Sequence, residues 1–150
     1  MVIAVDFDGT IVEHEYPKIG REIPFAIDVL KRLQKEEFHQ LILWSVREGE
    51  LLNEAVEYCR QRGLEFYAVN SDHPGEPYTN EIETRKLNAD LFIDDRNVGG
   101  LPDWGVIYRM IKYKQSWSEA IGNPETDYVS KRKPNLLIRL GELWDAASRK

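Results

Sequence analysis

The chain has 150 residues, of which 42% are hydrophobic, and this length supports one domain with a sizeable core rather than two. Its formal net charge of -6 gives no general attraction to nucleic acid or to an anionic membrane surface, and no apolar run reaches the length of a membrane span. Cys59 is the only cysteine, so an intrachain disulfide is excluded and a cytoplasmic location is expected.

The first stretch of the chain joins a short apolar run to two carboxylates. Residues 2–5 are continuously apolar, which is typical of a strand buried on both faces of a parallel sheet. The run ends in Asp6 and Asp8, and Gly9 permits a tight turn after them. Taken alone, these residues also suit an ordinary acidic turn. Because ligands of open α/β sheets bind where the strands end, this turn is the first candidate site.

Three further elements are predicted between this turn and the middle of the chain. The segment over 11–23 mixes apolar and charged residues around a proline and a glycine, which favours a hairpin-like flap over the acidic turn. Apolar residues at helical spacing predict helices over 24–37 and 50–62. Between them, the apolar residues 41–44 predict a second buried strand, which ends at Ser45.

The second half continues the alternation of strands and helices. Its predicted elements are a strand over 64–69, a loop over 70–80, a short helix or turn over 82–88 that carries Lys86, a strand over 89–95 that ends in Asp94 and Asp95, and an edge strand over 104–108. An extension over 109–150 follows, with one turn of helix at 117–121 and an amphipathic helix over 135–147.

This alternation predicts an α/β fold: a three-layer, Rossmann-like, doubly wound parallel sheet with helices on both faces. Right-handed crossovers bring the ends of the strands to one edge of the sheet. The polar residues expected to converge there are Asp6, Asp8, Ser45, Lys86, Asp94 and Asp95. We expect the core to span residues 1–108. The helix of the 109–150 extension would dock on this core or on another subunit.

In order and spacing, these residues resemble the four motifs of the haloacid dehalogenase-like (HAD) phosphatases, over roughly residues 1–108. The first motif of that family, Asp-x-Asp-x-Thr after a hydrophobic strand, stands here as Asp6 to Thr10. The gaps before and after Ser45 are too short to hold a folded cap domain. The resemblance is therefore to the capless members, and is closest to small bacterial ones of unassigned substrate.

The resemblance implies a hydrolase of phosphomonoesters that acts through an aspartyl-phosphate intermediate. Asp6 would be the nucleophile and Asp8 the general acid and base, while Thr10 braces the turn. The groups implied to offset charge on the phosphoryl group are Ser45, Lys86 and backbone N–H groups near Phe7 and Gly9.

The acidic pairs also indicate a bound cation. Two carboxylates about 5 Å apart repel by roughly 3 kcal/mol at an effective dielectric constant near 20. All-oxygen ligands beside a phosphate suit Mg²⁺, which keeps several waters. The predicted protein ligands are Asp6, Asp94 and the backbone carbonyl of Asp8, with Asp95 binding through water or supporting the others.

Two classes of substrate are compatible with a capless site. We expect a small phosphorylated metabolite, with self-association into a homo-oligomer supplying part of the enclosure. The alternative is the phosphorylated end of a polynucleotide, whose backbone Arg47, Arg96 and Lys112 would contact. Arg47 and Arg96 are the substrate-binding candidates among the basic residues.

Other classes of protein compete with a phosphatase. A receiver-like signalling domain also carries acidic residues at a sheet edge, but its acidic pair and its phospho-accepting Asp come in a different order. A dehalogenase would have no use for Asp8 or a metal, because a halide leaves without a proton. A non-catalytic binding module derived from a phosphatase is the third alternative, and an assay with Mg²⁺ and an aryl phosphate separates it from an enzyme.

Overall fold

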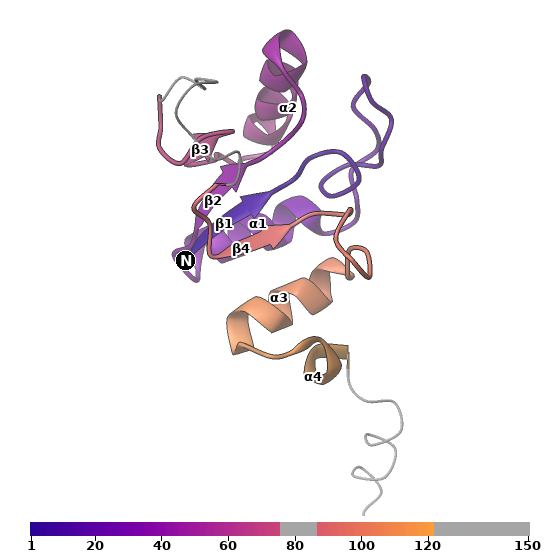
Figure 1. The fold of residues 1–150 in the computed structure, drawn as a ribbon, viewed down its shortest axis with the longest axis vertical. Coiled ribbons are helices and arrows are strands. Elements are labelled where there is room, and N and C mark those ends of the chain that lie inside the picture. Colours follow the sequence, from indigo (N-terminus) through magenta and orange to yellow (C-terminus); the bar gives the residue numbers. More distant parts are fainter. Residues whose placement is uncertain (76–86, 122–150) are drawn as a thin grey trace, which may run out of the picture. The chain divides into compact units, whose positions relative to one another are not determined.

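The computed structural model describes residues 1–75 and 87–121 (Figure 1). The chain divides into two compact units, Met1–Lys114 and Gln115–Lys150. The elements of the first unit are β1 (Val2–Val5), α1 (Ala26–Lys35), β2 (Gln40–Leu43), α2 (Gly49–Gln61), β3 (Ala68–Val69), β4 (Leu91–Ile93) and α3 (Trp104–Tyr113). In the second unit the described element is α4 (Trp117–Ile121), which matches the helical turn predicted there. No helix within the described ranges is long and apolar enough to cross a membrane.

The four strands form one parallel sheet in the order β3-β2-β1-β4. Strand β1 is interior, with Ile3 aligned between Leu41 of β2 and Leu91 of β4. Its residues Ile3 and Val5 are fully buried, as the apolar run predicts. The parallel sheet with its helices confirms the predicted α/β class, and it brings the ends of all four strands to one edge.

Helices α1, α2 and α3 share one hydrophobic core with one face of this sheet. Alternate strand residues face the helices, and the members of the shared core include Ile3, Val5, Leu41, Leu43 and Ile93 of the sheet, Leu30 and Leu33 of α1, Cys59 of α2 and Trp104 of α3. Ala4 and Ile42 are buried on the opposite face, where Trp44 and Phe92 pack edge to face at 5.1 Å. The second helical layer expected on that face is not among the described residues and stays a prediction.

The predicted edge strand over 104–108 is wrong, because these residues begin helix α3. The Asp103 carboxylate caps this helix by accepting the N–H groups of Gly105 (2.8 Å) and Val106 (3.2 Å). The buried residues repeat at helical spacing, as Trp104, Ile107, Tyr108 and Ile111. The first five residues alone are too few to separate this period from that of a strand.

Two other predictions have different outcomes. The strand predicted over 64–69 is reduced to Ala68–Val69, because the Leu64 N–H bonds to the Cys59 carbonyl at the end of α2. The element predicted over 82–88, apart from its last two residues, and the amphipathic helix predicted over 135–147 lie outside the described residues.

The flap over 11–23 has the predicted hairpin-like form. Its two arms are joined by hydrogen bonds from the Glu13 N–H to the Arg21 carbonyl (2.7 Å) and from the Ile23 N–H to the Ile11 carbonyl (2.9 Å). Gly20 allows the arms to approach, since a Cβ at this position would lie 2.0 Å from the Glu13 carbonyl oxygen.

Candidate active site

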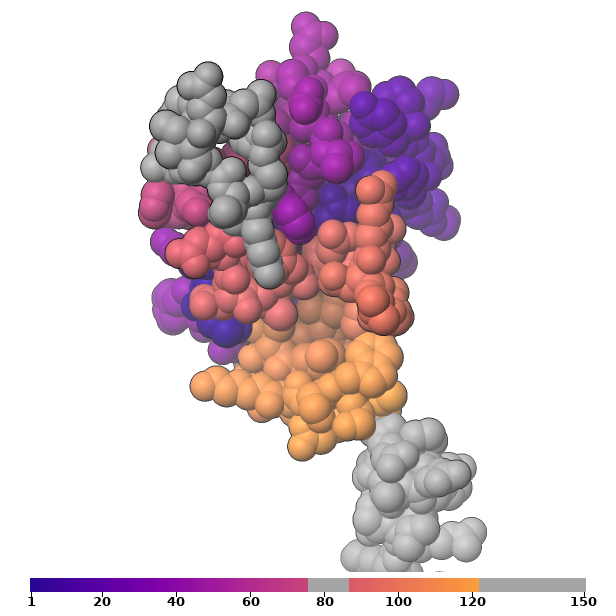
Figure 2. Space-filling view, viewed as in Figure 1, coloured from indigo at the N-terminus to yellow at the C-terminus, as the bar shows by residue number. Residues whose placement is uncertain are grey.

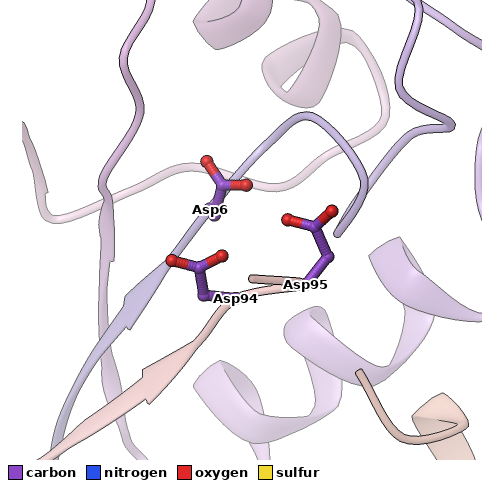
Figure 3. A group of neighbouring side chains, drawn as sticks. All are labelled: Asp6, Asp94 and Asp95. Carbon is purple, nitrogen blue, oxygen red and sulfur yellow. The ribbon is translucent and has the colours of Figure 1, made fainter. Parts of the chain in front are cut away.

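Three carboxylates gather where two neighbouring strands end (Figure 3). Asp6 directly follows β1, and Asp94 and Asp95 directly follow β4. The Asp6 N–H bonds to the Ile93 carbonyl at 2.9 Å, which extends the pairing of the two strands and brings Asp6 beside Asp94. One carboxylate oxygen of each of the three residues lies within 4.8 Å of the others, and all three side chains are half-buried. We call this group the acidic cluster.

Thr10 braces the acidic cluster, as predicted. Its buried hydroxyl accepts the Asp95 N–H at 3.1 Å and lies 3.4 Å from Asp6 Oδ2, to which it donates. The Thr10 carbonyl in turn accepts the indole N–H of the buried Trp104 at 3.2 Å. Helix α3 therefore supports the turn after β1, a role that the strand predicted at this position could not have had.

The loop after β4 adjoins the turn after β1, and their surfaces lie together in Figure 2. Gly9 makes this approach possible, since a Cβ there would lie 2.3 Å from Asp95 Oδ2. Its φ of 87° is also a conformation that side chains rarely adopt. The Gly9 N–H bonds to the Val12 carbonyl at 2.7 Å, so this donor already has a partner within the turn. Its predicted role in binding substrate is therefore corrected to a role in shaping the turn.

The Phe7 side chain lies in the core, and the predicted contact of its backbone N–H with substrate stays a prediction. Its side chain is fully buried, with its ring 5.9 Å from that of Tyr58 in an edge-to-face contact. Its backbone N–H interacts with the Asp6 carboxylate. This interaction lowers the pKa of Asp6 and so opposes the larger effect of burial.

The electrostatics of the acidic cluster favour a cation. Burial is the main cause that raises the pKa of Asp6 to about 7; the Phe7 N–H opposes it, and the negative charges of Asp94, Asp95 and Asp8 add to it. The Asp95 Oδ1 atom is buried and has no hydrogen-bond partner within the part of the chain that the structure describes. A buried acceptor without a donor is costly unless something else satisfies it. A hard divalent cation such as Mg²⁺ fits this set of oxygens, and Asp6, Asp94 and Asp95 would hold it.

Asp8 does not share this environment, although it lies only two residues from Asp6. Its carboxylate forms a two-pronged ion pair with Arg47: Nε lies 2.6 Å from Oδ2, and Nη2 lies 2.7 Å from Oδ1. The two side chains are 3% and 0% exposed, so the pair is almost fully buried. These hydrogen bonds raise the pKa of the Arg47 guanidinium. Arg47 is thus not open to substrate, which corrects its predicted role in substrate binding. The Asp8 carboxylate is not among the metal-ligand candidates. The Asp8 backbone carbonyl as a metal ligand stays a prediction.

Ser45 follows β2 at the same edge and is fixed by a residue that the sequence analysis did not single out. The Asn70 side chain accepts the Ser45 N–H at 2.8 Å and donates to the Ser45 carbonyl at 2.9 Å. Asn70 directly follows β3 and has a φ of 50°, which Asn tolerates better than most residues. Its position after a predicted strand was the available signal. The Ser45 hydroxyl accepts the Arg47 N–H at 3.3 Å and keeps its own proton to donate.

The other basic candidates differ in exposure. The Arg96 side chain is exposed, with no hydrogen bond or ion pair to the rest of the described chain, while its backbone N–H bonds to Asp94 Oδ1 at 2.9 Å. Lys112 forms an ion pair with Glu37 at 2.9 Å and bonds to the Tyr108 hydroxyl. Lys86 lies outside the described residues, so its predicted role stays a prediction.

No model of a known protein family matches the chain, and no curated protein does. Among solved structures, it is similar to a conserved protein from Bacteroides thetaiotaomicron, with 66% sequence identity and a TM-score of 0.74. The match covers 81% of this chain and 98% of that one. The two proteins belong to the same family. That relative is described only as a conserved protein, so the function proposed below is built on the side chains of this chain.

Proposed function

We propose that the protein is a cytoplasmic, capless HAD-like phosphatase that hydrolyses a small phosphorylated metabolite through an aspartyl-phosphate, with Mg²⁺ as cofactor. The observation that carries this proposal is the acidic cluster at the ends of β1 and β4, with its buried Asp95 oxygen that has no hydrogen-bond partner in the described part of the chain. A surface acidic patch would leave its oxygens open to water. Here the carboxylates instead lie at a half-buried edge of the sheet, where a bound cation would offset their charge.

Asp6 is the proposed nucleophile. A carboxylate oxygen of Asp6 attacks the phosphorus, a P–O bond to Asp6 forms, and the P–O bond to the leaving group breaks. The Phe7 N–H and the Thr10 hydroxyl hold this carboxylate in place, which favours one attack geometry. Bound Mg²⁺ would supply a Lewis acid that offsets charge on the phosphoryl oxygens.

Asp8 is the proposed acid and base. It gives a proton to the leaving alkoxide in the first step and takes one from the attacking water in the second, which regenerates Asp6 and releases inorganic phosphate. A carboxylate has about four lone-pair positions, and Arg47 occupies only one on each oxygen, so room for the proton remains. Ser45 and Lys86 would donate to the phosphoryl oxygens.

The basic residues favour a small substrate over a polynucleotide end. Of the three cations proposed to contact a polymer backbone, Arg47 is buried in its pair with Asp8 and Lys112 is paired with Glu37. Only Arg96 remains exposed and unpaired within the described ranges. Loss of two of the three proposed phosphate contacts lowers the affinity expected for a polymer.

The Asp8–Arg47 pair also favours a second candidate, a non-catalytic binding module that keeps the cation site. In that case the buried pair would be structural, and no step would need Asp8 to exchange a proton. Ligand binding would then depend on the acidic cluster, while phosphate esters would stay intact.

The decisive experiment measures release of an aryl alcohol from an aryl phosphate with and without Mg²⁺. We expect Mg²⁺-dependent turnover by the wild type, and a loss of roughly a thousandfold or more in Asp6→Asn, because the covalent route disappears. Acid quenching of the wild type should trap a phosphoryl group on Asp6. Turnover that survives in Asp6→Asn would refute the nucleophile, and no turnover with any ester would favour the binding module.

A further inference from the structure

Arg47 joins three segments that are distant in the sequence. It lies in the loop after β2 and grips the Asp8 carboxylate, which follows β1. Its remaining donors reach the flap: Nη1 bonds to the Pro17 carbonyl at 2.9 Å and Nη2 to the Lys18 carbonyl at 2.8 Å. Four of the five guanidinium N–H groups are thereby used, two on the proposed acid and two on the flap.

Aromatic rings from both sides enclose this guanidinium. Its Cζ atom lies 5.2 Å from the ring centroid of Phe7, on the turn after β1, and 5.3 Å from that of Tyr16, in the flap. Cations over aromatic faces are further stabilised when water is excluded, and Arg47 is 0% exposed. The guanidinium is therefore held by four hydrogen bonds and lies close to two aromatic rings.

We call the Asp8–Arg47 pair with its two flap contacts the joint, because we expect it to stay closed rather than to open and close. Breaking it would leave a buried charge and two backbone carbonyls without partners, which costs far more than opening an exposed pair. Lysine cannot replace it, because an ammonium group lacks the planar fork that meets both carboxylate oxygens at once.

We propose that Arg47 is a positioning residue that fixes the direction of the Asp8 carboxylate and couples it to the flap. The catalytic consequence rests on the proposed phosphatase function, whereas the coupling itself rests on the geometry alone. While Arg47 holds the flap in place, the Asp8 carboxylate keeps one orientation. When the flap is displaced, this orientation is lost.

A groove lies beside the flap. Ile19, next to Lys18, faces helix α2 across an open groove of about 480 Å³, whose other lining residues are Asn53, Glu54, Glu57, Tyr58 and Gln61. Because Ile19 belongs to the flap, displacement of the flap should change the shape of this groove.

The test compares Arg47→Lys with Arg21→Lys. Both changes keep a positive charge, and both sites carry an arginine that pairs with a carboxylate, but the Arg21–Glu13 pair is exposed on the flap and does not touch Asp8. The first measurement is kcat and KM on an alkyl and on an aryl phosphate, since only the alkyl leaving group depends strongly on a proton. The second is hydrogen exchange of the flap amides of Glu13 and Ile23.

We expect Arg47→Lys to lower kcat on the alkyl ester about tenfold to a hundredfold more than on the aryl ester. It should also speed exchange of the flap amides, while Arg21→Lys changes the ratio of the two esters by less than about twofold. Equal losses on both esters with unchanged flap exchange would overturn the proposal. A gain in kcat in Arg47→Lys would also overturn the proposal, because the Asp8–Arg47 pair would then inhibit turnover.

A second variant covers the case in which Arg47→Lys does not fold. Asp8→Asn removes the charge on the other side of the joint, and the coupling predicts faster exchange at the flap amides, since Arg47 loses its anchor. Unchanged exchange would refute the coupling. If the wild type hydrolyses no ester, the proposed function fails, and the exchange data still decide whether Arg47 couples Asp8 to the flap.

Discussion

The turn after β1 holds two carboxylates, and the fold treats them in opposite ways. Asp6 joins Asp94 and Asp95 in a half-buried cluster of like charge, which contains an oxygen that accepts no hydrogen bond from residues 1–75 or 87–121. Asp8, two residues on, is almost fully buried and carries an arginine on both oxygens. Among the described residues, the first site lacks a positively charged partner, whereas the second has one in Arg47.

This difference assigns separate tasks to the two residues. A buried carboxylate whose charge is not offset raises the free energy of the ligand-free protein, and this favours binding of a cation. An anion that is fully paired adds rigidity and direction instead. The comparison is consistent with the proposed roles of Asp6 as metal-binding nucleophile and Asp8 as proton carrier. The following changes test these roles, from the largest expected effect to the smallest.

Asp8→Asn should discriminate between leaving groups. Without a proton donor, turnover of an alkyl phosphate should fall by roughly 10²- to 10⁴-fold, while an aryl phosphate, which leaves without a proton, should lose much less. Steady-state kinetics on both esters measures the ratio. Because Asp8 also serves the second step, quench experiments should follow the phosphorylated enzyme directly. An equal defect in its formation from both esters would remove Asp8 from the acid role.

Arg47→Met should cost far more stability than Arg21→Met. The first change leaves Asp8 buried and unpaired, which typically costs about 3–5 kcal/mol of unfolding free energy. The second breaks a pair whose side chains are 80% and 44% exposed, which is worth less than about 1 kcal/mol. Urea unfolding of both variants gives the comparison. Similar losses would mean that the Asp8–Arg47 pair is not the fixed joint described here.

The metal-free protein should lose stability as pH rises, through Asp6. Its pKa is about 7 in the folded state and 3.8 in the unfolded chain, so the folded state holds the proton more tightly. The resulting penalty builds up between these two values and is complete above pH 7. Relative to Asp6→Asn, the wild type should lose up to about 3 kcal/mol between pH 5 and pH 8. Urea unfolding in a chelator measures this difference, and a constant difference would mean an ordinary pKa.

The strands and the acidic edge could be predicted from the sequence because both depend on local patterns. A continuous apolar run followed by a carboxylate indicates where a parallel strand ends, and it located Asp6, Asp94 and Asp95 correctly beside one another. Thr10 followed from the same turn. The register of β1 with β4 then brings the three carboxylates together without further information.

The partners that come from elsewhere in the fold could not be predicted in this way. The charge of Arg47 suggested a substrate contact, and only the folded flap and turn reveal that it is buried on Asp8. The sequence predicts a strand at Trp104, where the structure has a helix. Asp103 caps this helix through backbone N–H groups of its first turn, and their positions are known only from the fold. Asn70 clamps Ser45 across two strands, a contact that no local pattern contains.

The central claim is that the acidic cluster is a Mg²⁺ site, and thermal unfolding with increasing Mg²⁺ tests it most directly. A cation that binds only the folded state adds about 2.7 kcal/mol of stability at a hundred times its dissociation constant. Asp28→Ala is the matched control, since this exposed aspartate lies on α1, outside the cluster. We predict that Mg²⁺ raises the Tm of the wild type and of Asp28→Ala alike, and leaves that of Asp94→Ala unchanged. A Mg²⁺-dependent rise that survives in Asp94→Ala would contradict the account and locate the ion elsewhere.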